Sequence, residues 1–269
     1  MLLLERPAHS PHPRAPSKPP VPAFWLGVHQ PHWLGRSSVP MFLSNRRLAR
    51  LKSLPRALGP WALDSGGFTE ITTYGEWRTS PKQYVELIRR YHDEVDQLAW
   101  ASQQDFMCEE QALRMTGLTI EEHQDLTVEN FLTLRDLAPD LRIIPVVQGW
   151  LRPQYLRCVE KFMAAGIDLT REPLVGVGSI CRRPSTYVAS WILQDLHAAG
   201  LRLHAFGYKK TGLEVSWPHV VSADSMAWSK GGRYERICGT HKSEANCLDY
   251  ALRWRGDLLD HLAEIRDRA

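Results

Sequence analysis

Eight short apolar runs recur along this chain, and they alternate with segments whose apolar residues have helical spacing. The runs occupy residues 23–28, 41–44, 61–64, 98–106, 142–148, 174–178, 201–206 and 220–224. Nearly continuous apolar strands that alternate with helices are typical of a parallel sheet that is covered on its faces. Eight such units in 269 residues predict an α/β fold of the (β/α)8, or TIM-barrel, type. A doubly wound open sheet is the alternative.

Helices are expected at residues 45–54, 81–95, 119–137, 153–165, 184–199 and 245–266. Pro81, Pro153 and Pro184 fall near three of these helix starts, where a missing N–H leaves no hydrogen bond unmade. No long linker interrupts residues 23–269, so we expect them to form one barrel domain. Residues 1–22 are rich in proline and carry basic side chains, which predicts a disordered basic arm.

The composition limits where the protein works and what it binds. Five cysteines, an odd number, do not indicate a disulfide framework, so we expect a reducing, cytoplasmic setting. Residues 1–4 are too short for the apolar part of a signal peptide, and no apolar run is long enough to span a bilayer. A net charge of +3 permits a nucleic-acid partner without requiring one.

Polar residues and glycines follow the expected strands, where a barrel of this type places its active site. Three carboxylates belong to this set, Asp64, Asp105 and Asp224. The other members are His29, Gln30, Ser65, Gln148, Gly149, Gly176, Gly178, Gly207, Tyr208 and Ser225. Each residue alone is typical of a cap or a turn. Three acids gathered at one end of a barrel would repel one another, however, which indicates that a substrate uses them.

The order and spacing of these strand ends resemble the tRNA-guanine transglycosylase superfamily. The motifs are Asp64-Ser65-Gly66-Gly67-Phe68, Asp105 after a strand, Pro145-Val146-Val147-Gln148-Gly149, Val175-Gly176-Val177-Gly178, His204-Ala205-Phe206-Gly207 and Ser222-Ala223-Asp224-Ser225. Residues 222–228 and 246–254 are most similar to the deazapurine-in-DNA insertion (DpdA-like) branch, whose members act on DNA. The resemblance covers about residues 23–255.

The resemblance implies a DNA-guanine transglycosylase that exchanges guanine for a 7-deazaguanine base such as preQ0. In such a reaction a carboxylate attacks the sugar C1′ and holds a covalent glycosyl intermediate, as in retaining glycosidases. By position, Asp224 resembles the nucleophile of the family and Asp64 resembles the acid/base that handles protons on the two bases. No organic cofactor is expected.

Base recognition is assigned from the hydrogen-bonding groups of guanine. Asp105 would accept from N1–H and the exocyclic amine, while the Gln148 amide and a backbone N–H near Gly178 would donate to O6. A base taken out of the helical stack would lie between aromatic or apolar side chains, and Phe68, Phe106 or Met107 are expected there. These three could equally be ordinary core residues. Ser65, Gly149 and Gly176 complete the predicted substrate-binding set.

A second cluster follows the last expected strand, where Cys238, His241, Glu244 and Cys247 are each separated by two residues. Soft and borderline ligands at such spacing predict a small structural zinc site near the C-terminus. Members of the superfamily carry zinc in this region, usually with more cysteines than this chain has. A metal-free loop with buried cysteines is therefore the alternative.

Basic residues also follow the later strands and could contact the phosphates of a nucleic acid. They are Arg182, Arg183, Lys209, Lys210, Lys230 and Arg233. The sequence leaves open tRNA as the substrate, a catalytically silent binding subunit, a helper protein and the oligomeric state. The presence of both Asp64 and Asp224 argues against the silent subunit.

Overall fold

The computed structural model describes residues 18–181, 183, 186–238 and 240–269. Nine strands form one sheet, and every recorded strand pair is parallel. The strands are β1 (Ala23–Val28), β2 (Met41–Ser44), β3 (Trp61–Asp64), β4 (Leu98–Ser102), β5 (Ile143–Ile144), β6 (Val146–Val147), β7 (Val175–Val177), β8 (Leu203–Ala205) and β9 (Ser222–Ser225). Most of the predicted arm lies outside the described residues, which begin at Lys18.

The sheet closes into a barrel because β5 and β6 are two halves of one expected strand. The spatial order runs β5-β4-β3-β2-β1-β9-β8-β7-β6, so the two halves lie at its ends. Pro145 separates them and has no N–H to donate, while its carbonyl accepts from the Gly176 N–H at 2.8 Å. When β5 and β6 are counted as one interrupted strand, eight parallel strands form the barrel. This arrangement confirms the TIM-type prediction and excludes the open doubly wound sheet.

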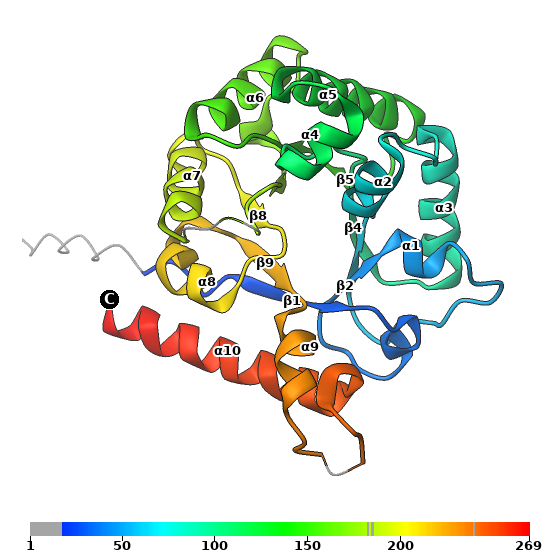
Figure 1. Cartoon of the computed structure of the whole chain (residues 1–269), viewed down its shortest axis with the longest axis vertical. Coiled ribbons are helices and arrows are strands. Elements are labelled where there is room, and N and C mark those ends of the chain that lie inside the picture. The colour runs from blue at the N-terminus through cyan, green and yellow to red at the C-terminus, as the bar shows by residue number, and fades with distance from the viewer. Residues whose placement is uncertain (1–17, 182, 184–185, 239) are drawn as a thin grey trace, which may run out of the picture.

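Helices surround the strands (Figure 1). Five of them confirm the expected segments: α3 (Pro81–Glu94), α5 (Ile120–Leu137), α6 (Arg152–Ala164), α7 (Thr186–Ala198) and α10 (Leu248–Arg268). The helix expected at 45–54 is shorter, α1 (Asn45–Leu48). Four short helices that the sequence did not predict lie between the strands and the longer helices: α2 (Gly67–Tyr74), α4 (Glu110–Thr116), α8 (Lys210–Ser216) and α9 (Ala227–Gly231). The described residues also contain short 3-10 helices: η1 (Pro31–Gly35), η2 (Leu169–Arg171), η3 (Trp217–His219), η4 (Gly232–Tyr234) and η5 (Glu244–Asn246).

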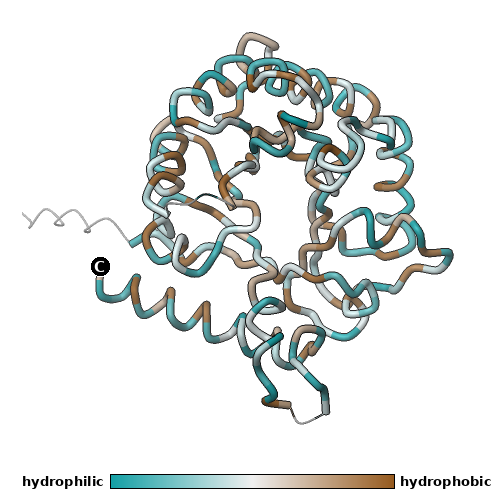
Figure 2. Tube along the Cα trace, viewed as in Figure 1, coloured by the Kyte–Doolittle hydropathy of each residue, from teal (hydrophilic) through white to brown (hydrophobic). Residues whose placement is uncertain are grey.

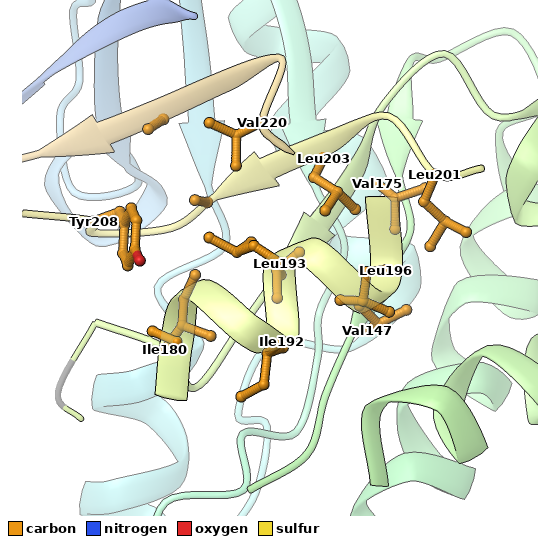
Figure 3. Packing of buried hydrophobic residues seen from close by; sticks show 14 of the residues in the cluster. Val147, Val175, Ile180, Ile192, Leu193, Leu196, Leu201, Leu203, Tyr208 and Val220 are labelled. Carbon is orange, nitrogen blue, oxygen red and sulfur yellow. The ribbon is translucent and has the colours of Figure 1, made fainter. Parts of the chain in front are cut away.

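An outer core lies between the strands and the helices. In Figure 3, Leu193 and Leu196 of α7 pack near Val175 and Leu203 of the sheet, and all four are buried. Hydrophilic and hydrophobic residues alternate along α10 in Figure 2, as expected for a helix with one buried face. No described helix is both long and apolar enough to cross a membrane.

An inner core fills the barrel with aromatic rings. The Trp100 ring lies 5.6 Å from Trp25, 5.4 Å from Phe42 and 4.8 Å from the His204 ring, measured between centroids. Phe206 lies 4.7 Å from His204 and 6.5 Å from Trp100. The interior is thus closed by large side chains beneath the carboxyl ends of the strands.

We expect Trp100→Ala to lower the free energy of unfolding by about 3–5 kcal/mol, because it leaves a cavity that the surrounding rings cannot fill. Trp191→Ala, whose side chain is exposed on α7, is the matched control and should change it by less than about 1 kcal/mol. Chemical denaturation measures both. Equal effects of the two substitutions would contradict the proposed inner core.

Candidate active site and metal cluster

A cavity of about 250 Å³ opens at the carboxyl ends of the strands. It is lined by Phe42, Asp64, Ser65, Gly67, Phe68, Ser102, Asp105, Met107, Glu109, Gln148, Gly178, Ser179, Cys181, Phe206, Gly207 and Asp224. All three predicted carboxylates line this one cavity, together with Gln148, Gly178, Ser65 and Phe68.

Three other predicted substrate residues do not line the cavity. Phe106 is buried and packs on the His123 ring at 5.6 Å, so it is a core residue. Gly149 lies against Tyr155, and Gly176 lies inside β7, where an added Cβ would be 2.4 Å from the Phe206 ring. These two glycines lie behind the residues that line the cavity, and they allow neighbouring side chains to pack closely there.

Asp224 lies in β9 and is held by two groups. Its Oδ1 accepts from the Gly207 N–H at 2.8 Å and lies 3.3 Å from His204 Nε2. The other ring nitrogen of His204 lies 2.8 Å from the Ser222 hydroxyl. His204 can donate to Asp224 from Nε2 if Nδ1 accepts from Ser222, and this pairing selects one neutral tautomer. Both contacts to Asp224 are to Oδ1, and no described residue donates to Oδ2.

Asp64 ends β3 on the same cavity. Its Oδ1 accepts from the Gly66 N–H at 3.1 Å, and Gly66 has the left-handed φ of 83° that begins α2. Loss of hydration raises the pKa of Asp64, and the nearby charge of Asp224 raises it further, against the lowering effect of hydrogen bonds from Gly66 and Ser44. A carboxyl group with a raised pKa retains its proton more readily, which suits a general acid.

Asp105 and Gln148 form the second polar side of the cavity. The Gln148 Nε2 donates to Asp105 Oδ2, and burial raises the pKa of Asp105 to about 7. Gly178 makes room for this amide, because an added Cβ would lie 2.1 Å from Gln148 Nε2. The Gly178 N–H donates to Val147 O at 3.1 Å, so it belongs to the sheet and is not a free donor for a ligand.

Two polar residues of the cavity, Ser179 and Glu109, were not predicted from the sequence. Ser179 directly follows Gly178 and has a φ of 53°, which is rare for a residue with a side chain. Its Oγ lies 2.7 Å from Gln148 Oε1 and 2.6 Å from Glu109 Oε2. Glu109 is 8% exposed and makes no ion pair with a described residue. Glu109 follows the fourth strand, and this position alone could have indicated a site residue, because the site is formed by residues at the strand ends.

The predicted basic residues separate into two groups. Lys209, Lys210, Lys230 and Arg233 are exposed on or beside α8, α9 and η4. Arg183 is instead bound to the protein: its guanidinium lies 4.6 Å from the centroid of the Trp150 ring and donates to Tyr155 Oη at 3.1 Å. Arg182 lies outside the described residues.

Cys238, His241, Glu244 and Cys247 lie together, with one donor atom of each within 4.8 Å of all the others. Cys238 Sγ and His241 Nδ1 are 2.8 Å apart. Glu244 Oε1 accepts from the N–H groups of Ile237 and Cys238, whereas its buried Oε2 has no hydrogen-bond partner. An unpaired buried carboxylate oxygen beside two thiols and an imidazole fits a tetrahedral zinc ion.

Comparisons with known proteins give one match that covers nearly the whole chain. The model of the family described as DpdA, DeoxyPurine in DNA protein A, matches residues 22–268. A search of curated proteins found no match. A similar solved structure is the crystal structure of an amidohydrolase from Burkholderia ambifaria with bound zinc, at 18% identity and a TM-score of 0.36. The alignment covers 61% of this chain and 49% of the amidohydrolase, so this chain spans about half the length of that protein.

If zinc occupies the cluster, Cys247→Ser should remove it, because a hydroxyl is a much poorer zinc ligand than a thiolate. We expect metal analysis to fall from about one zinc per chain to nearly none and the melting temperature to fall with it. A strong chelator should lower the melting temperature of the wild type and leave that of the variant unchanged. Carefully purified wild type without zinc would contradict this assignment.

Proposed function

The chain belongs to the DpdA family, deoxypurine in DNA protein A, and we propose that it exchanges guanine in DNA for a 7-deazaguanine base such as preQ0. The observation that carries the proposal is the meeting of Asp224 and Asp64 with Asp105 and Gln148 around one cavity. The first pair supplies a nucleophile and an acid/base, and the second pair supplies the hydrogen-bonding groups that a guanine edge requires.

Asp224 would act through Oδ2, which is the oxygen without a described donor. Oδ2 attacks C1′ of the deoxyribose, the bond from C1′ to N9 breaks, and its electron pair leaves with the guanine base. Asp64, with its raised pKa, gives a proton to that base. The Gly207 N–H and the His204 ring hold Oδ1 and so fix the plane of the attacking carboxylate.

The second half of the exchange reverses these roles. The deprotonated Asp64 removes the proton from the five-membered ring nitrogen of the incoming 7-deazaguanine, and that nitrogen attacks C1′. The ester bond to Asp224 breaks, and the carboxylate is restored. Two displacements at C1′ retain the configuration of the nucleoside, as in retaining glycosidases.

Guanine and 7-deazaguanine present the same hydrogen-bonding edge, so one set of residues can bind both. Asp105 would accept from N1–H and the exocyclic amine, and the second N–H of Gln148 Nε2 would donate to O6. Phe68 and Met107 line the same cavity and would contact the faces of the extruded base. This arrangement requires Asp105 to be ionised.

Exposed basic residues near the cavity would hold the DNA backbone. Lys209 and Lys210 begin α8 and follow β8, and Lys230 and Arg233 follow β9. Gly207 follows β8 and Asp224 lies near the carboxyl end of β9, so these cations and the proposed nucleophile would share one rim of the barrel. Family membership supports DNA rather than tRNA as the substrate.

Asp224→Asn should abolish incorporation of a labelled 7-deazaguanine base into duplex DNA, by at least about a thousandfold, because an amide cannot form the glycosyl ester. Asp64→Asn should slow exchange severely while allowing a trace of covalent adduct, since the nucleophile remains. Asp93→Asn, an exposed carboxylate on α3, is the control and should keep full activity. Near-full exchange by Asp224→Asn, or labelling of tRNA in place of DNA, would refute the proposal.

Replacing Lys209 and Lys210 together by alanine should weaken DNA binding and reduce the slope of log affinity against log salt by about two. Lys82→Ala, exposed on α3, is the control and should leave the slope unchanged. Binding titrations at several salt concentrations measure both. An unchanged slope in the double variant would place the DNA backbone elsewhere on the protein.

A further inference from the structure

A chain of hydrogen bonds connects two carboxyl groups in the wall of the cavity. It runs from Asp105 Oδ2 to Gln148 Nε2, then from Gln148 Oε1 to Ser179 Oγ at 2.7 Å, and from Ser179 Oγ to Glu109 Oε2 at 2.6 Å. The Cys108 N–H also donates to Ser179 Oγ, at 2.9 Å. All of these side chains are at least nine-tenths buried, so each of their polar atoms needs a hydrogen-bond partner.

The single hydroxyl of Ser179 limits how many protons this series of hydrogen bonds can hold. Ser179 Oγ has one proton to give and two lone pairs, and the Cys108 N–H occupies one lone pair. Two oxygens, Gln148 Oε1 and Glu109 Oε2, nevertheless lie within hydrogen-bonding distance of it. One of them can receive the Ser179 proton. The group at the other position must donate to the remaining lone pair.

Two arrangements satisfy this requirement. In the first, a protonated Glu109 donates to Ser179, Ser179 donates to Gln148 Oε1, and Gln148 Nε2 donates to an ionised Asp105. In the second, the Gln148 amide is turned over and donates to Ser179, Ser179 donates to an ionised Glu109, and a protonated Asp105 donates to Gln148 Oε1. In both, the two carboxyl groups hold one proton between them.

Only the first arrangement presents a guanine-type edge with a carboxylate acceptor at Asp105 and an N–H donor at Gln148. We propose that Glu109 is a positioning residue for base specificity: its proton, passed through Ser179, fixes the orientation of the Gln148 amide and keeps Asp105 ionised. The inference rests on the proposed function, because the ligand it concerns is the guanine or 7-deazaguanine base.

The charged surroundings favour a shared proton. On the cavity side Asp105 interacts with both Asp64 and Glu109, and Cys108, Tyr155 and Arg183 are the titratable or charged groups on the other sides. The Arg183 guanidinium is held by Trp150 and Tyr155 and makes no ion pair with Glu109. Burial raises the pKa of Asp105 to about 7, and a negative charge on Glu109 adds to this rise. A proton on Glu109 removes that contribution, so Asp105 ionises more readily.

The sign of the pH dependence follows from the proton count. When both carboxyl groups are ionised, neither of them can donate, so Ser179 can no longer satisfy both of its neighbours and the Gln148 amide loses its fixed orientation. Affinity for the base should therefore fall as pH rises. In Glu109→Gln the new amide can donate to Ser179 at every pH, so the same orientation is kept without a proton.

The experiment is calorimetric binding of free 7-deazaguanine to the full chain from about pH 6 to about pH 9. We expect the affinity of the wild type to fall at least about tenfold over this range, and that of Glu109→Gln to stay within about twofold above pH 7. Glu109→Ala, which can donate nothing, should bind about tenfold more weakly than the wild type at pH 6. Glu110→Gln, an exposed neighbour that pairs with Arg114, is the matched control and should behave as the wild type.

An alkaline fall in Glu109→Gln equal to that of the wild type would overturn the inference, as would equal losses in Glu109→Gln and Glu109→Ala. Infrared difference spectra at pH 6 test the same proton without any ligand. The wild type should show one more carboxylic-acid C=O band than Glu109→Gln, and identical spectra would also overturn the inference. Failure of the wild type to bind the base at any pH would refute the proposed function, and the infrared result would then decide the shared proton independently.

Discussion

Closure of the parallel sheet is the constraint on which the rest of the structure depends. Asp64 and Asp224 are far apart in the sequence, and they line one cavity because β3 and β9 both belong to a sheet that returns on itself. Closure requires the fifth strand to pair with β4 through its first half and with β7 through its second. Pro145 lies between those halves. There β7 needs only the Pro145 carbonyl, which accepts a hydrogen bond from the Gly176 N–H. The ladder is therefore completed without the missing N–H.

The cavity produced by this closure concentrates negative charge. Four carboxyl groups line it, and no lysine, arginine or histidine is among its described lining residues. Buried acids without cations destabilise a fold unless they are hydrogen-bonded or protonated. Here backbone N–H groups hold Asp64 and Asp224, and the Gln148 amide holds Asp105. The cost in stability that remains is the kind that proteins retain at functional sites, where the same groups act on a substrate.

The sequence predicted the positions of the strands better than the contacts between side chains. Apolar runs bounded by proline, glycine or polar residues gave β1, β2 and β3 with their observed ends. The fourth strand ends at Ser102, four residues earlier than expected, and Phe106 consequently lies in a loop and packs in the core. Glu109, Ser179 and His204 could not be assigned in the same way. Their roles depend on hydrogen bonds between different strands or the loops that follow them, and no pattern within one segment encodes such distances.

His204 links the stability of the barrel to the chemistry proposed for it. Its ring is fully buried among Phe42, Trp100 and Phe206, which fix its position in the inner core. The same ring lies against Asp224, so the packing of those aromatic residues sets the position of the hydrogen bond to the carboxylate. A buried histidine destabilises an apolar core unless its polar atoms are hydrogen-bonded, so both ring nitrogens need partners here. Ser222 and Asp224 supply them, which makes the orientation of the nucleophile a consequence of how the interior is filled.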